Sequence, residues 1–86
     1  MIYALCDQEM IKKNHSTIED FIKLASLNNA KIIQYRAKNL DLKEKKKNLL
    51  FIRSRWSGML IINDEISLVK YCDGLHLGQE DLVLYD

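Results

Sequence analysis

Short apolar runs alternate along the chain with longer stretches in which apolar residues recur every three or four positions. The short runs predict strands at 1–6, 31–35, 59–62 and 75–77. The run at 59–62 shows no polar alternation, which is typical of a strand buried on both faces. Strands that alternate with helices indicate βαβ units and a parallel sheet.

The stretches between the strands carry helix signals. Ser16 and Glu19 fit a capping box, and the apolar residues that follow at helical spacing, to about Asn28, are Ile18, Phe21, Ile22 and Ala25. Asp41 and Glu44 repeat the signal before a second stripe, made of Leu42, Leu49, Ile52 and Trp56. The residues at 43–47 are mostly lysines that fall between the stripe positions, which favours a solvated helix face over a phosphate or RNA site.

Two shorter helices are expected toward the end of the chain. Ile66, Leu68, Val69 and Cys72 predict a short third helix, and Glu80–Asp81 predicts the opening of a fourth. The repeated unit of strand plus helix fits either a (β/α)₈ barrel or a doubly wound sheet.

Composition narrows the class of protein. Eighty-six residues, 48% of them hydrophobic, predict one globular unit at 1–86, whereas a complete (β/α)₈ barrel needs about 250 residues. A net charge of +1 with mixed signs argues against nucleic acid as a partner, so small molecules or a second copy of the chain are expected. Asp7 interrupts the first apolar run, and no run approaches the ~18 residues of a membrane helix, so we expect a cytoplasmic protein without membrane contact.

The two cysteines, Cys6 and Cys72, are expected to be free buried thiols, because disulfides are rare in cytosolic proteins. With His15 and His76 they would offer four metal ligands. Their spacing is not that of a zinc site, so core cysteines and unrelated histidines are the favoured interpretation.

A cluster of polar residues follows the strand predicted at 31–35. Gln34, Arg36 and Lys38 alternate with Tyr35 and Ala37, so the first three side chains point to one face if the strand continues. An amide, a guanidinium and an ammonium at the end of a strand make an anion site. An ordinary polar strand end is the alternative.

Two further clusters follow later strands. Asn63 and Asp64 come directly after the run at 59–62, where the alternative role is to cap the third helix. Asp81 has an alternative role as a helix N-terminal residue. Together, two carboxylates facing a cationic site supply what Mg²⁺ bridging a pyrophosphate requires. His76 is expected to line the same site as a packed, hydrogen-bonded side chain and not as a catalytic group.

The clusters at 34–38, 63–64 and 73–81, in this order and spacing, resemble those of the thiamine phosphate synthase (thiamine-phosphate pyrophosphorylase) family. The resemblance runs from Ile2 to about Leu82. It implies an α/β fold made of parallel βα units of a TIM (β/α)₈ barrel, of which this chain carries about the first four strands and lacks the C-terminal half.

The resemblance also implies a function. Members of the family are transferases that condense hydroxymethylpyrimidine pyrophosphate with thiazole phosphate, with Mg²⁺, to give thiamine phosphate and pyrophosphate. The positions that match the family's pyrophosphate contacts are Gln34, Arg36, Lys38 and Asn63, and those that match its magnesium ligands are Asp64 and Asp81. Ala37 stands where the family usually has glutamate, Gln79 matches a contact to the pyrimidine or the metal shell, and no catalytic general base is implied.

Two other interpretations stay open. A thiazole tautomerase on the same barrel would need neither pyrophosphate nor metal, and it is disfavoured because the positions for both are filled. A catalytically silent chain is the other: either a truncated product, which we favour, or a half-barrel that closes with a second copy. A silent chain would lack the family's thiazole-phosphate site, which comes from the second half of the barrel.

Overall fold

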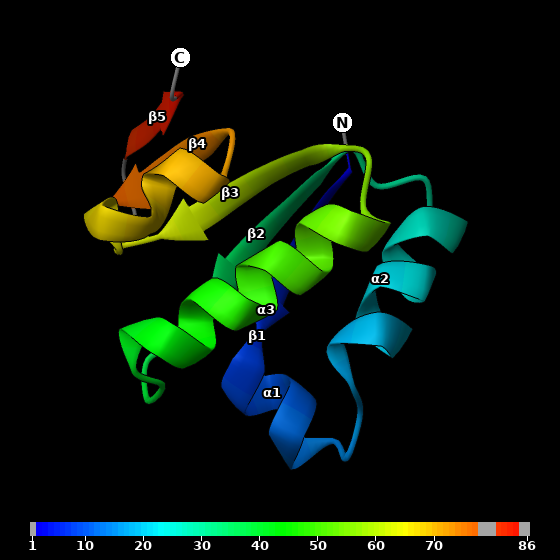
Figure 1. The fold of residues 1–86 in the computed structure, drawn as a ribbon. Coiled ribbons are helices and arrows are strands. Elements are labelled where there is room, and N and C mark those ends of the chain that lie inside the picture. Colours follow the sequence, from blue (N-terminus) through cyan, green and yellow to red (C-terminus); the bar gives the residue numbers. More distant parts are fainter. Residues whose placement is uncertain (1, 78–80, 85–86) are drawn as a thin grey trace.

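The computed structural model describes residues 2–77 and the backbone path of 81–84 (Figure 1). The elements in chain order are β1 (Tyr3–Asp7), α1 (Gln8–Lys13), α2 (Ile18–Leu27), β2 (Ile32–Arg36), α3 (Leu42–Arg55), β3 (Met59–Asn63), the 3₁₀ helix η1 (Ile66–Tyr71), β4 (Gly74–Leu77) and β5 (Asp81–Leu84). None of the helices in the described ranges is long and apolar enough to cross a membrane.

The strands form one sheet in the order β1-β2-β3-β4-β5. The first four strands are parallel, and the register aligns Leu5 of β1 with Gln34 of β2, which in turn aligns with Ile61 of β3. Strand order therefore follows chain order, as in consecutive βα units of a barrel. The α/β fold class predicted from the sequence is confirmed.

The last strand corrects a prediction. Residues 80–81 were expected to open a helix, but β5 begins at Asp81 and pairs antiparallel with β4, with Asp81 opposite Leu77. The residues after Asp81 are Leu82, Val83 and Leu84, a β-prone apolar run, and the edge of β4 offers unpaired backbone groups to it. The sheet therefore contains an antiparallel pair that the purely parallel prediction lacked.

The helices cover one face of the sheet (Figure 1). Strand residues on that face form one buried cluster with the helices, and the cluster includes Ile33, Tyr35, Leu60, Ile62, Leu75, Ile22, Leu49 and Ile52. On the opposite face Tyr3 and Leu5 of β1 remain 45% and 44% exposed. The two faces thus differ: one builds the core, and the other leaves side chains accessible beside the strand ends.

Helix ends follow the expected capping chemistry with one shift. Asp41 caps α3, because its Oδ1 accepts a hydrogen bond from the Glu44 amide at 2.9 Å. For α2 the cap is Thr17 and not Ser16, since Thr17 Oγ1 accepts from the Asp20 amide at 3.1 Å. The prediction that Leu42 belongs to the buried stripe is wrong, since its side chain is 49% exposed. The buried residues of α3 are Leu49 and Ile52.

Two short helices differ from the sequence prediction. The helix α1 was not predicted, although Asp7 caps it by accepting hydrogen bonds from the Glu9 and Met10 amides. The third helix lies where it was expected, but as the tighter 3₁₀ form, with the Leu68 amide donating to the Glu65 carbonyl at 3.1 Å.

Candidate functional site

A cleft of about 390 Å³ lies at the carboxyl ends of the parallel strands, on the face that the helices leave open. It is lined by Tyr3, Leu5, Gln34, Arg36, Lys38, Asn63, Asp64 and His76. Most of the residues predicted for the site therefore meet in one place. The side chain of Asp81, and Gln79 and Glu80 entirely, lie outside the described part of the chain.

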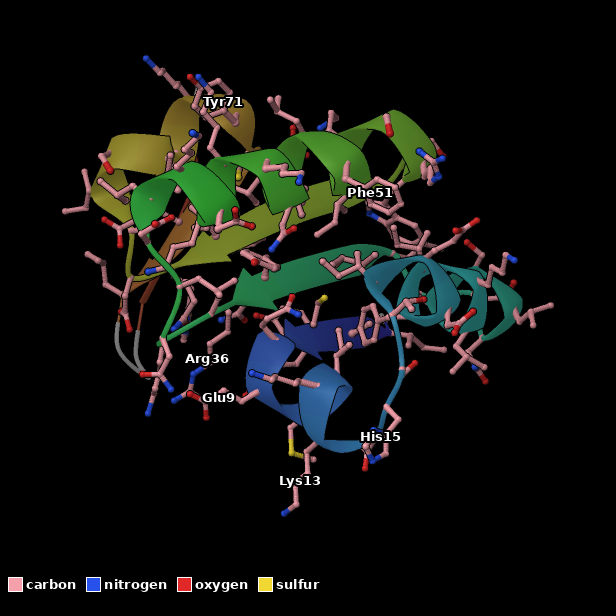
Figure 2. The ribbon with its side chains drawn as sticks, turned by 60° about the horizontal axis from the view of Figure 1, so that its bottom comes forward. Glu9, Lys13, His15, Arg36, Phe51 and Tyr71 are labelled. Carbon is pink, nitrogen blue, oxygen red and sulfur yellow. The ribbon has the colours of Figure 1, made fainter. Side chains whose placement is uncertain are left out.

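The cationic side of the cleft comes from β2 and the segment after it. Arg36 is the last residue of β2 and lies at its carboxyl end, while Glu9 belongs to the helix that follows β1 (Figure 2). Tyr35 and Ala37, which alternate with the cleft residues, belong to the buried cluster on the helix face. The predicted alternation is confirmed, and Ala37 faces the core as expected.

Tyr35 anchors β2 from behind the cleft. Its side chain is fully buried, and its hydroxyl accepts a hydrogen bond from Asn48 Nδ2 of α3 at 2.8 Å. Burial raises the pKa of Tyr35 to about 12, with the Asn48 hydrogen bond acting in the opposite direction. The phenol is therefore neutral at pH 7 and fixes the strand that carries Arg36.

A chain of hydrogen bonds joins three strand ends inside the cleft. Gln34 Nε2 donates to Asn63 Oδ1 at 2.7 Å, and Asn63 Nδ2 donates to Asp64 Oδ2 at 3.1 Å. His76 Nδ1 lies 2.9 Å from Asn63 Oδ1 and 3.2 Å from Gln34 Nε2. Gln34 is 5% exposed, so this network satisfies a buried amide as well as shaping the site.

The network also bears on the tautomer of His76. The Asp64 carboxylate accepts from the amide nitrogen of Asn63, which turns Asn63 Oδ1 toward Gln34 and His76. Since that oxygen can only accept, the 2.9 Å contact is satisfied when His76 Nδ1 carries the proton. In the neutral ring, His76 Nε2 then keeps its lone pair. The packed, hydrogen-bonded role expected for His76 is confirmed.

Asp64 sits in an unusual backbone conformation. Its φ is 63°, in the left-handed region that aspartate enters more readily than most residues, and its amide donates to the His76 carbonyl at 2.8 Å. The alternative role of Asn63 and Asp64 as a helix cap is wrong. The residue before η1 is Glu65, and no side chain caps that helix.

Asp64 lines the cleft, and a magnesium site of the kind expected would combine one or two carboxylates with phosphate oxygens and water. Within the described residues no three His, Cys, Asp or Glu side chains gather as a metal site would require. The pairing of Asp64 with Asp81 stays a prediction. Cys6 and Cys72 are free and buried, as expected, and burial raises the pKa of each thiol to about 12.

Two cleft residues were missed at the sequence level. Tyr3 and Leu5 line the cleft from β1, and they share a face of the strand because they are two positions apart. The alternation in the first strand contained this signal, but neither side chain carries chemistry that singles it out. They supply an apolar wall opposite the polar network.

Comparison with known proteins identifies the family of this chain. The family model of thiamine monophosphate synthase matches residues 2–86. The chain is 41% identical to the thiamine-phosphate synthase of Caldicellulosiruptor saccharolyticus, over 93% of this chain and 38% of that protein. It is 43% identical to the thiamine-phosphate synthase of Caldicellulosiruptor bescii, over 86% of this chain and 36% of that protein.

A third relative, the thiamine-phosphate synthase of Dictyoglomus turgidum, is 34% identical over 93% of this chain and 37% of its own length. The chain thus spans a little over a third of the relatives it matches. No solved structure gives a significant match. The match to the family model over residues 2–86 and the identities to these relatives place this chain in the thiamine monophosphate synthase family.

Proposed function

We propose that this chain supplies the pyrophosphate- and magnesium-binding part of a thiamine-phosphate synthase, the transferase that condenses hydroxymethylpyrimidine pyrophosphate with thiazole phosphate. The observation that carries the proposal is the cleft in which Arg36, Lys38 and Asp64 meet the Gln34–Asn63–His76 network. Cations, a carboxylate and amide groups in one cleft of about 390 Å³ suit a small polyanion.

The reaction asks the protein mainly to stabilise a leaving group. When the bond between the pyrimidine methylene and pyrophosphate breaks, negative charge builds up on the departing oxygens. Arg36 can grip two of those oxygens at once, and Lys38 adds a compact positive charge. Asn63 is held in one orientation by Gln34 and Asp64, so its contact to the pyrophosphate needs little reorganisation.

The proposed metal ligands are Asp64 and Asp81. When bound, Mg²⁺ would neutralise part of the charge on the pyrophosphate oxygens. Asp64 also accepts the Asn63 hydrogen bond, so this carboxylate would link the metal position to the polar network. Removal of either carboxylate should therefore weaken the binding of pyrophosphate only when Mg²⁺ is present.

Pyrophosphate binding is the part of this proposal that can be measured on the chain itself, because the chain spans little more than a third of its relatives. The experiment is a calorimetric titration of the 86-residue chain with inorganic pyrophosphate, with and without Mg²⁺. We expect saturable binding that depends on Mg²⁺. Arg36→Ala should weaken it at least about tenfold, because a charge-assisted hydrogen bond is lost.

Arg55→Ala is the matched control. Arg55 carries the same charge but stacks on Phe51 of α3, with its guanidinium carbon 4.2 Å from the ring centre. Binding should be unchanged in that variant. Equal affinity of Arg36→Ala and the unaltered chain would refute the role of Arg36. An equal affinity for pyrophosphate with and without Mg²⁺ would refute the role of the metal.

A further inference from the structure

One lysine of the run at 43–47 does not belong to a solvated face. The side chain of Lys45 is only 14% exposed, whereas the other lysines of the run are exposed. Lys45 precedes Leu49 and Ile52 by four and seven positions, so it lies on the face of α3 that packs toward the sheet. An ammonium group on that face needs a partner, because an unpaired charge there is unfavourable.

The partner of Lys45 is Glu65, which lies between β3 and η1. Lys45 Nζ donates a hydrogen bond to Glu65 Oε2 at 3.2 Å, and the Glu65 side chain is 29% exposed. The other carboxylate oxygen accepts from Ser67 Oγ at 3.4 Å, and the Glu65 carbonyl accepts from the Leu68 amide at 3.1 Å. Both the side chain and the backbone of Glu65 are therefore held in place.

Glu65 directly follows the turn that shapes the cleft. Asp64 has a φ of 63°, a conformation that is unfavourable for residues with a side chain unless the surrounding structure holds it. The Asp64 amide donates to the His76 carbonyl at 2.8 Å, and the next residue is fixed to α3 through Lys45. The orientation of Asn63, whose side chain donates to Asp64, depends on this turn.

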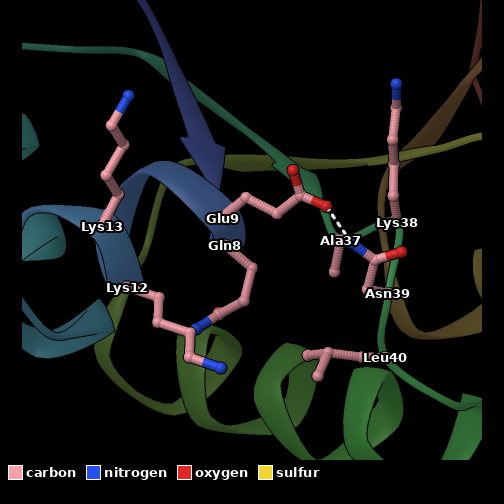
Figure 3. Close-up of a pocket in the computed structure, with 8 residues that line it drawn as sticks. All are labelled: Gln8, Glu9, Lys12, Lys13, Ala37, Lys38, Asn39 and Leu40. Atoms are coloured by element: carbon pink, nitrogen blue, oxygen red, sulfur yellow. Dashed lines mark hydrogen bonds between the residues drawn. The ribbon is translucent and has the colours of Figure 1, made fainter.

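Helix α3 contacts both strands whose ends carry the cleft. Asn48 donates to the hydroxyl of Tyr35 in β2, which lies behind the cleft. Lys45, three positions earlier on the same face of α3, fixes the turn after β3. The segment that leads from β2 to α3 is itself held, since Asn39 Nδ2 donates a hydrogen bond to the Glu9 carboxylate of α1 (Figure 3). The helix therefore sets the cationic side and the polar network of the cleft relative to each other.

We propose that Lys45 is a positioning residue of the cleft. By holding Glu65, it keeps Asp64 in its turn and Asn63 in the orientation that meets His76. It acts through these residues and not on a ligand, because it is not among the described residues that line the cleft. The consequence for pyrophosphate binding rests on the proposed function, whereas the effect on the polar network is independent of it.

The first measurement uses no ligand. The ring nitrogens of His76 and the side-chain amide of Asn63 are observed by NMR of the whole chain at fixed pH. Lys45→Met should shift both sets of resonances, because the turn that orients Asn63 is released, and Lys45→Arg, which keeps the charge, should return them toward their original positions. Arg53→Met is the matched control. It removes the ion pair of α3 with Asp73 at the amino ends of the strands, and should lower stability without moving these resonances.

The second measurement separates positioning from a direct electrostatic effect on the pyrophosphate. Lys45→Met removes a positive charge, whereas Glu65→Gln removes a negative one. If Lys45 acted through its own charge, the two variants would change the affinity for Mg²⁺-pyrophosphate in opposite directions. We expect both to weaken binding about threefold to tenfold, and the double variant to bind no more weakly than either single variant, since both remove the same interaction. Lys47→Met, at an exposed position of the same helix, should leave the affinity unchanged.

Three results would overturn the proposal. The first is unchanged resonances of His76 and Asn63 in Lys45→Met, whether or not the chain binds pyrophosphate. The second is a change of affinity in opposite directions for Lys45→Met and Glu65→Gln. The third is an equal shift of the resonances in Arg53→Met. If the resonances shift as expected but the unaltered chain does not bind pyrophosphate, the proposed function is refuted and the role of Lys45 in the network is supported.

Discussion

Charged side chains have different surroundings at the two ends of the parallel strands. At the amino ends, Arg53 Nη2 donates to Asp73 Oδ2 at 2.6 Å, and the Leu60 amide donates to the same oxygen at 2.8 Å. At the carboxyl ends, Arg36 and Lys38 line an open cleft. Charge at the amino ends is thus paired within the fold, whereas charge at the carboxyl ends lines a cleft that is open to solvent.

Packing follows the same division. At the amino ends, Trp56 is 6% exposed, its Nε1 donates to the Met59 carbonyl at 3.0 Å, and its ring lies against Gly58. Beyond the carboxyl ends, Lys38 and Asp64 are exposed. In barrel enzymes the amino-terminal face serves stability and the carboxyl-terminal face carries the site. The comparison predicts that substitutions at the two ends will separate stability from binding.

The largest effect is expected at Trp56. Trp56→Ala removes a buried indole and its hydrogen bond, and should lower the free energy of unfolding by about 3–5 kcal/mol. Urea denaturation followed by circular dichroism measures the loss. Leu27→Ala, at a side chain 78% exposed, is the control and should change stability by less than about 0.5 kcal/mol. Similar losses in the two variants would break the comparison.

The next effect is expected at Gly58, where an added Cβ would lie 2.7 Å from Trp56 Cζ2 and 2.9 Å from the Lys31 carbonyl oxygen. Gly58→Ala should therefore lower the free energy of unfolding by about 1–3 kcal/mol, the usual cost of overpacking. Thermal denaturation gives the measurement, with Ser57→Ala at the exposed neighbouring position as the control. A midpoint no lower than that of Ser57→Ala would show that the loop accommodates the methyl group.

A smaller, pH-dependent effect is expected at Asp73. Burial alone would raise its pKa, but the hydrogen bonds from Arg53 and the Leu60 amide outweigh it, so the pKa is lowered from 3.8. A lowered pKa in the fold adds stability that is present above pH ~4 and is lost as the pH falls through the folded value. Because the side chain is 45% exposed, Asp73→Asn should cost only about 1 kcal/mol at pH 7.

Denaturation of the unaltered chain and of Asp73→Asn at a series of pH values between 7 and 3 measures this contribution. The difference between the two proteins should shrink as the pH falls below about 4, because the native carboxylate becomes protonated. A difference that stays constant down to pH 3 would mean that the charge of Asp73 contributes nothing to stability.

Much of the fold followed from the sequence because strand and helix periods are distinct over long segments. The helices α2 and α3 each have a capping residue and an apolar stripe, so their positions were predictable. The helix α1 was missed because six residues with a single buried side chain, Ile11, make no periodic pattern. The strand β5 was mistaken for a helix because pairing with the edge of β4, a tertiary interaction, decides its conformation.

The candidate site was predictable for a geometric reason. Parallel strands bring their carboxyl ends to one edge, so polar residues after successive strands must gather there. What the sequence could not provide was the set of contacts between them. The turn at Asp64, with its φ of 63°, and the resulting orientation of Asn63 depend on the backbone path between β3 and η1. The tautomer of His76 depends in turn on Asn63.

The smallest change in stability is expected at Gln34. The comparison between the two ends of the strands predicts that a substitution there weakens the binding of pyrophosphate instead. Gln34→Met keeps the volume of a side chain that is 5% exposed but removes the donor to Asn63 Oδ1, which still has His76 Nδ1 at 2.9 Å. Stability should change by less than about 1 kcal/mol, since the remaining polar pair stays satisfied. Binding of Mg²⁺-pyrophosphate should weaken about tenfold, because Asn63 is less firmly oriented and one amide is lost. Urea denaturation and calorimetry on the same sample give both numbers. A large loss of stability with unchanged binding would place Gln34 with Trp56, among the residues that maintain the fold. Residues near the carboxyl ends would then also serve stability, which the comparison does not predict.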